Sequence, residues 1–219
     1  MTINKQDRRE LLSGLGVAAA AIALGSTPAR AQTRGTFAPA RHTQDEWLDQ
    51  LPGKHRVFID SVSSAGISDA LLYASNYFAA SKSGYGLEDA DVAVIVCMRH
   101  FSTPFAFNNA MWAKYGKPMA DMAKYTNPRS TDVPTANPHV PRSGTAGFTG
   151  LAAKGTQFAI CDMATHFLAG QIATATGGKA DDIYQELAAN TVPNGRFVAA
   201  GVIGATRAQE YGYTLLVAG

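Results

Sequence analysis

The sequence predicts a three-layer α/β/α fold with a five-stranded parallel sheet. Short apolar runs rich in β-branched residues alternate with helical patterns, which is typical of βαβ units. Hydrophobic residues make up 46% and charged residues 16% of the 219 residues. This composition is too apolar for an intrinsically disordered chain, and the length is sufficient for one domain with a substantial core.

Five runs predict the strands. The run DVAVIVCM is almost wholly apolar, as expected for a parallel strand that is buried on both faces. The other four are shorter or less uniform, but each is bounded by polar or turn-forming residues. The predicted strands are 56–62, 91–98, 156–163, 195–202 and 213–219.

Helical patterns occupy the segments between these runs. A short helix around Trp47 and Leu48 should end before Pro52. Later helices are predicted from N-capping residues and from glycines that suit a helix end. They are 70–82 after Ser68 with a stop at Gly84, 104–115, 163–176 after Asp162, and 183–190 after Asp182.

Residues 1–31 resemble a cleavable export signal. Arg8 and Arg9 precede a short apolar stretch, and Ala29-Arg30-Ala31 supplies a cleavage site. The paired arginines indicate the twin-arginine route, so we expect a periplasmic protein that begins near Gln32. The run 11–24 has 14 residues, fewer than the roughly 20 that a membrane span needs, so no membrane anchor is expected in the mature form.

The remaining 188 residues carry 15 basic and 15 acidic side chains. Because nucleic-acid binding needs clustered positive charge, a neutral chain gives no support to a nucleic-acid partner.

We divide the mature chain into an N-terminal extension, 32–52, and one α/β domain, 53–219. The domain contains a proline-rich insertion at 116–155, which we interpret either as a lid or as a segment that packs over one sheet edge.

Cys97 and Cys161 both fall at the carboxyl ends of predicted strands. In a parallel sheet we expect those strands to be neighbours, which would place their Cα atoms about 5–6 Å apart, within the range of a disulfide. Alternatively, Cys161 is a nucleophile, because a helix N-terminus favours the negative charge of a thiolate. His166 would then assist Cys161, and Cys97 would resolve an intermediate.

A third interpretation is a soft-metal or haem site. Thiolate, thioether and imidazole groups suit copper or haem iron, although no CxxCH or paired CxxC spacing is present. The candidate ligands are Cys97, Met98, His100, Cys161, Met163 and His166. Other polar residues near the strand ends are candidates for binding a ligand, namely Asp60, Arg99, His100 and Asp162.

Several common functional motifs do not occur in the sequence. The first strand is not followed by GxGxxG, and neither GxxxxGK[ST] nor GxSxG is present. Nucleotide-binding and serine-hydrolase functions therefore lose their main support.

The C-terminal third resembles the DsrE/DsrF-like family of sulfur-relay proteins. The resemblance rests on FAICDMATHFLAG, a VPNG turn, and the run with Gln209, Gly212 and Tyr213 before the last strand. It implies a five-stranded parallel sheet, subunits that associate into a homo-oligomer, and a persulfide on Cys161. Small sulfur species or a partner thiol protein would be its partners.

Two functional hypotheses follow. In the first, an exported DsrE/DsrF-like protein handles sulfur or thiol redox chemistry through Cys161. In the second, the chain is a non-enzymatic periplasmic module that binds a small ligand, a soft metal or haem.

Overall fold

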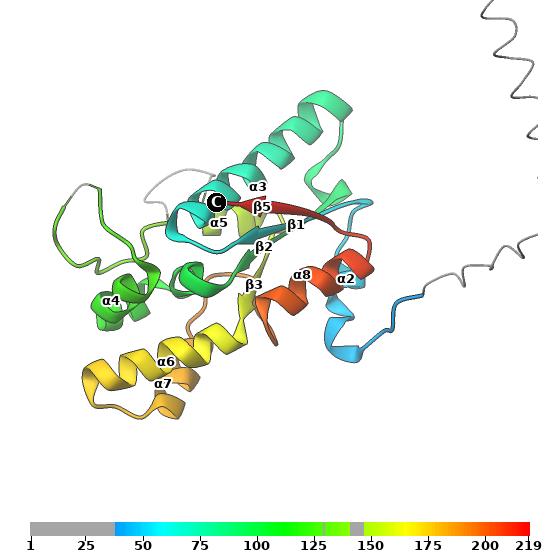
Figure 1. Ribbon diagram of the computed structural model, residues 1–219. Helices are drawn as coiled ribbons and strands as arrows, with labels where there is room; N and C mark the ends of the chain where they lie inside the picture. Colours follow the sequence, from blue (N-terminus) through cyan, green and yellow to red (C-terminus); the bar gives the residue numbers. More distant parts are fainter. Residues whose placement is uncertain (1–37, 129, 141–146) are drawn as a thin grey trace, which may run out of the picture. The chain divides into compact units, whose positions relative to one another are not determined.

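Five parallel strands form one sheet in the computed structural model, which describes residues 38–128, 130–140 and 147–219. The strand order is β4-β3-β2-β1-β5, and helices cover both faces (Figure 1). The predicted α/β/α fold with a five-stranded parallel sheet is therefore confirmed. The strands are β1 (His55–Ser61), β2 (Val92–Met98), β3 (Gln157–Cys161), β4 (Gly195–Val198) and β5 (Thr214–Ala218).

One face of the sheet packs against the larger helical layer. Alternate strand residues such as Ile59, Val96 and Ile160 meet apolar side chains of these helices, among them Leu71 and Trp112. The layer comprises α3 (Ser64–Tyr85), α4 (Asn109–Ala123), α5 (Phe148–Ala153), α6 (Asp162–Thr176) and α7 (Ala180–Ala188).

The opposite face packs against α2 (Trp47–Gln50) and α8 (Gly201–Glu210). Phe58 and Ile95 point to this side because successive residues of a strand face opposite ways. Both meet a cluster that includes Leu48 and Ala208. The remaining short turns of 3-10 helix are η1 (Thr43–Asp45), η2 (Asp89–Asp91) and η3 (His100–Ala106).

The α/β unit begins earlier than the boundary predicted at residue 53. Residues 41–219 form one compact unit. Leu48 is buried in the core, and its carbonyl accepts hydrogen bonds from Tyr213 Oη and Arg56 Nη1, each at 2.8 Å. The second half of the predicted extension therefore belongs to the fold, while the predicted export signal lies outside the described residues.

Several helix boundaries differ from the predicted ones. The cap of α3 is Ser63, whose hydroxyl accepts from the Gly66 amide, and the helix ends at Gly86 rather than Gly84. Gly86 has a φ of 67°, a left-handed conformation that glycine adopts readily. Helix α7 begins at Ala180, before the predicted Asp182 cap, and α8 occupies a segment whose first residues were predicted as strand.

The proline-rich segment contains more helix than its composition predicts. Helix α4 continues through Pro118 to Ala123, because a break from helical geometry at Tyr115 accommodates the proline ring. Beyond it, the buried Asn137 amide donates to the carbonyls of Phe105 and Phe107, each at 2.8 Å. The Asn137 backbone amide donates to Asn109 Oδ1 at 3.0 Å, so this later part of the segment packs on η3 and on the start of α4.

Among the described residues, no helix combines the length and apolar character that a membrane crossing requires.

Candidate functional site

A cavity of about 490 Å³ lies at the carboxyl edge of the sheet. Its wall comes from the segments that follow β2 and β3, from the start of α8, and from α4. The lining residues are Arg99, His100, Phe101, Met122, Cys161, Met163, Ala164, Phe167, Ala200, Gly201 and Val202. This is the edge at which open parallel α/β sheets bind ligands.

Cys161 is the last residue of β3 and the N-cap of α6. Its side chain is buried, with 7% of the residue exposed, and it faces the cavity. No side chain in the described part of the chain caps this helix, so the positive end of α6 lies directly beside the thiol.

Cys97 is a different kind of thiol. It is fully buried between the sheet and α8. Burial raises the pKa of Cys97 well above its usual value, and the negative charges of Asp60 and Cys161 raise it further, while Arg99 opposes them. Cys97 is therefore protonated at neutral pH and has no route to a ligand in this arrangement.

The two cysteines lie on neighbouring strands, as predicted, but not side by side. Cys97 pairs with Ala159, and Cys161 lies two residues further along β3 on the same face. With about 4.8 Å between strands and 3.3 Å per residue, their Cα atoms are about 8 Å apart. Both are free thiols. The predicted separation of 5–6 Å is therefore wrong, and a disulfide or a resolving step would need the backbone to move.

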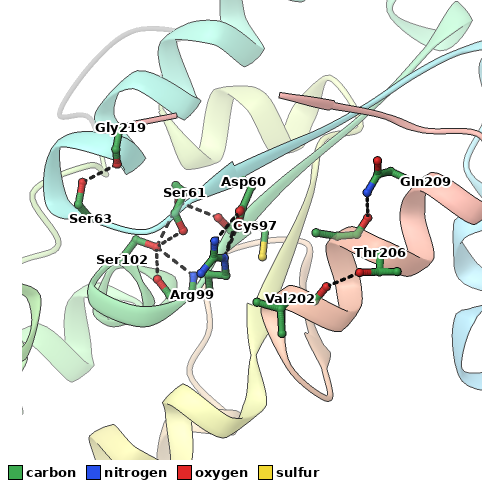
Figure 2. A network of polar contacts seen from close by, with 11 residues as sticks. Asp60, Ser61, Ser63, Cys97, Arg99, Ser102, Val202, Thr206, Gln209 and Gly219 are labelled. Carbon is green, nitrogen blue, oxygen red and sulfur yellow. Dashed lines mark hydrogen bonds and ion pairs between the residues drawn. The ribbon is translucent and has the colours of Figure 1, made fainter. Parts of the chain in front are cut away.

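Asp60 does not line the cavity, but it forms an ion pair with Arg99, which does (Figure 2). Arg99 Nε donates to both carboxylate oxygens at 2.8 and 3.1 Å, and Nη2 donates to Oδ2 at 2.8 Å. The Arg99 side chain is 27% exposed, and the Asp60 side chain is 6% exposed. The pair therefore places the positive charge of Arg99, compensated by the negative charge of Asp60, beside both cysteines.

The polar network around the pair fixes the Arg99 backbone. Ser102 Oγ accepts from the Arg99 amide at 3.0 Å, and Ser61 Oγ donates to the Cys97 carbonyl at 2.6 Å (Figure 2). The Arg99 stem lies against Gly201, where an added Cβ would come within 2.5 Å of the arginine Cβ. Only glycine at this first position of α8 leaves room for the arginine.

His100 follows Arg99 and also lines the cavity. Its φ is 57°, a left-handed conformation that a non-glycine residue rarely adopts, and its ring lies 3.9 Å from the Phe101 ring. Its imidazole is therefore placed at the cavity wall by a specific turn after β2.

The structure does not bring His166 to Cys161. His166 stacks on Tyr184 with ring centroids 3.9 Å apart, and its Nε2 is 3.7 Å from Asp162 Oδ2. Tyr184 Oη donates to Asp162 at 2.7 Å, and this hydrogen bond is the main reason why the pKa of Tyr184 rises to about 12. Five residues of helix separate His166 from Cys161 by about 140° around the axis. Asp162 and His166 thus belong to a separate surface cluster.

The six candidate soft-metal ligands do not converge. Met98 points into the larger helical layer, on the opposite face of the sheet from Cys97. Met163 lines the cavity but is 69% exposed, and His166 points elsewhere. The described residues contain no group of three His, Cys, Asp or Glu side chains suited to a metal. The predicted ligand set therefore does not form a site.

Sequence reasoning missed the apolar part of the wall. Phe101, Met122, Phe167 and Val202 come from four different segments, and none belongs to a recognisable motif. The start of α8 was predicted as strand, although Ala205 and Ala208 show the helical spacing of a buried face. Within the predicted insertion at 116–155, Met122 lines the cavity and the described residues from 125 to 140 do not. The lid interpretation stays a prediction.

No family model matches the chain, and no curated protein matches it. The fold and the cavity define an α/β protein with a cysteine at the carboxyl edge of a parallel sheet. The DsrE/DsrF-like resemblance stays a prediction from sequence motifs.

Proposed function

We propose that this protein handles sulfur or thiol redox chemistry through Cys161, as an exported DsrE/DsrF-like protein. One observation carries the proposal: Cys161 caps α6 in the wall of a cavity, whereas Cys97 is fully buried. The N-terminus of α8 and Arg99 also face the cavity. Helix N-termini such as those of α6 and α8 stabilise negative charge on a sulfur atom, whereas Asp60 already compensates the charge of Arg99.

The simplest reaction is the uptake of one sulfur atom. The Cys161 thiolate attacks the outer sulfur of a persulfide, RS–SH, and a new S–S bond forms as the old one breaks. RS⁻ leaves with the bonding electron pair, the proton stays on the transferred sulfur, and Cys161 becomes a persulfide. Because the donor supplies the oxidised sulfur, the step needs no other oxidant.

The mass of the intact protein tests this function. Reduced full-length protein treated with inorganic polysulfide should gain one or more sulfur atoms, and Cys97→Ser should gain the same. Cys161→Ser and Cys161→Ala should gain none while keeping the wild-type far-UV circular dichroism. Equal uptake by a folded Cys161 variant would refute the proposal.

A second candidate function is a periplasmic binding module for a small ligand. The observation in its favour is the cavity itself, whose volume and apolar wall suit a small molecule without any chemistry. A native preparation that carries a bound compound and takes up no sulfur would favour this function over the first.

We also propose that the mature protein is periplasmic and begins at Gln32. The twin arginines at Arg8 and Arg9 and the small residues before Gln32 support this. N-terminal sequencing of the exported protein tests it, and a secreted form that still begins at Met1 would contradict it.

A further inference from the structure

The charges around the cavity describe the kind of molecule that fits it. Arg99 is the one lining residue with a fixed charge in the part of the chain that the structure describes, and Asp60 compensates it through three hydrogen bonds. An adjoining hollow holds one acidic and one basic side chain, Asp121 and Lys124, and so adds no net charge. The wall therefore has no uncompensated cation to offer a second anion.

The positive helix ends are already matched by the cysteine itself. The N-termini of α6 and α8 both meet the cavity, and Cys161 lies at the first of them. When this thiol ionises, its own negative charge lies at the positive ends of these helices, where an anionic ligand would otherwise bind. An anionic ligand, inorganic polysulfide included, would then react with Cys161 more slowly than a neutral one, because the thiolate repels it.

The wall beyond the thiol is apolar and accessible. Met163 is 69%, Phe167 60% and Val202 55% exposed, and all three line the cavity together with Phe101 and Met122. Large apolar side chains that gather around a hollow are unusual at a surface that binds only water and ions. A volume of about 490 Å³ lies within the range of small-molecule sites.

We propose that the cavity binds a small, uncharged organosulfur compound, a disulfide or a protonated persulfide with an apolar body, whose sulfur meets Cys161. The inference rests on the proposed function of Cys161 and adds the class of its substrate. The apolar body lies against Phe167 and Val202, and the reacting sulfur lies between the ends of α6 and α8. With a disulfide, the thiolate forms a mixed disulfide and releases one thiolate, so atoms and electrons balance.

Three methanethiosulfonates test the substrate class, because they transfer different groups by one reaction. The thiolate takes the RS group and releases methanesulfinate. The probes carry a neutral benzyl, an anionic sulfonatoethyl or a cationic trimethylammonioethyl group. For each probe, the rate constant at Cys161 is divided by the rate constant of the same probe with free cysteine, which gives one ratio per probe. The benzyl ratio at Cys161 should exceed both charged ratios by about tenfold, the factor that corresponds to 1.4 kcal/mol of apolar contact.

Two variants provide the matched comparison. Phe167→Ser removes an exposed aromatic ring from the wall and should abolish most of the benzyl preference, because it lowers the benzyl rate more than the rates of the charged probes. Leu72→Ser removes an exposed apolar side chain on α3, away from the cavity, and should retain the preference.

The failures of the two proposals are distinguishable. If Cys161 reacts with every probe no faster than Cys97 does, the proposed function fails. If Cys161 reacts faster than Cys97 but the anionic ratio equals or exceeds the benzyl ratio, only the substrate class is overturned. A benzyl preference that changes with protein concentration would indicate that the apolar wall binds a second copy of the chain. That result would also overturn the proposed substrate class.

Discussion

Replacing Arg99 by methionine is expected to lower the free energy of unfolding by about 3 kcal/mol, the lower end of the range for a broken buried ion pair. Asp60 has only 6% of its side chain exposed, so its carboxylate would be left buried without its cation. Methionine preserves the stem that packs on Gly201. Urea denaturation at neutral pH measures the difference.

A double-mutant cycle separates lost pairing from lost packing. Asp60→Asn should cost less than Arg99→Met, because the Arg99 side chain is 27% exposed and its charge can turn to water. The double variant Asp60→Asn/Arg99→Met should recover most of the unfolding free energy that Arg99→Met loses. If Arg99→Met and the double variant are equally unstable, the pair contributes through packing alone.

Acidification is expected to cost the protein about 3 kcal/mol of stability between pH 6.5 and 4 through His139 alone. Burial lowers the pKa of His139 to about 4. Its Nε2 is buried without a hydrogen-bond partner among the described residues, and the Phe105 ring lies 4.8 Å away. Because the unfolded chain takes up a proton near pH 6.5 and the folded chain does not, stability falls as the pH falls through this window.

The variant His139→Phe isolates this effect from that of the carboxylates. The difference in unfolding free energy between wild type and variant should change with pH in that window and be constant above pH 7. Thermal unfolding followed at several pH values measures it. A difference that does not vary with pH would show that His139 is hydrated and titrates normally.

The sequence predicts the sheet well because burial on both faces leaves a direct pattern. The run that became β2 is continuously apolar, since Val94 and Val96 face one helical layer while Ala93 and Ile95 face the other. The positions of Cys97 and Cys161 at strand ends followed from the same pattern. Their strands were predicted as neighbours, and the structure pairs β2 with β3.

The details that decide the chemistry depend on packing that no local pattern contains. Strand register places Ala159, and not Cys161, opposite Cys97. The pairing of Asp60 with Arg99 joins residues 39 positions apart, and it depends on the space that Gly201 leaves. His166 turns to Tyr184 because α7 packs beside α6, a tertiary contact that helical spacing does not reveal.

The relative alkylation rate of the two cysteines tests the central claim most directly. Reduced full-length protein is treated with iodoacetamide at neutral pH, and each site is followed by peptide mass spectrometry. Cys161 should react at least about tenfold faster than Cys97, because burial keeps Cys97 protonated and closed off. Cys97 reacting as fast as Cys161, or Cys161 staying inert until the chain unfolds, would contradict a reactive thiol in the cavity.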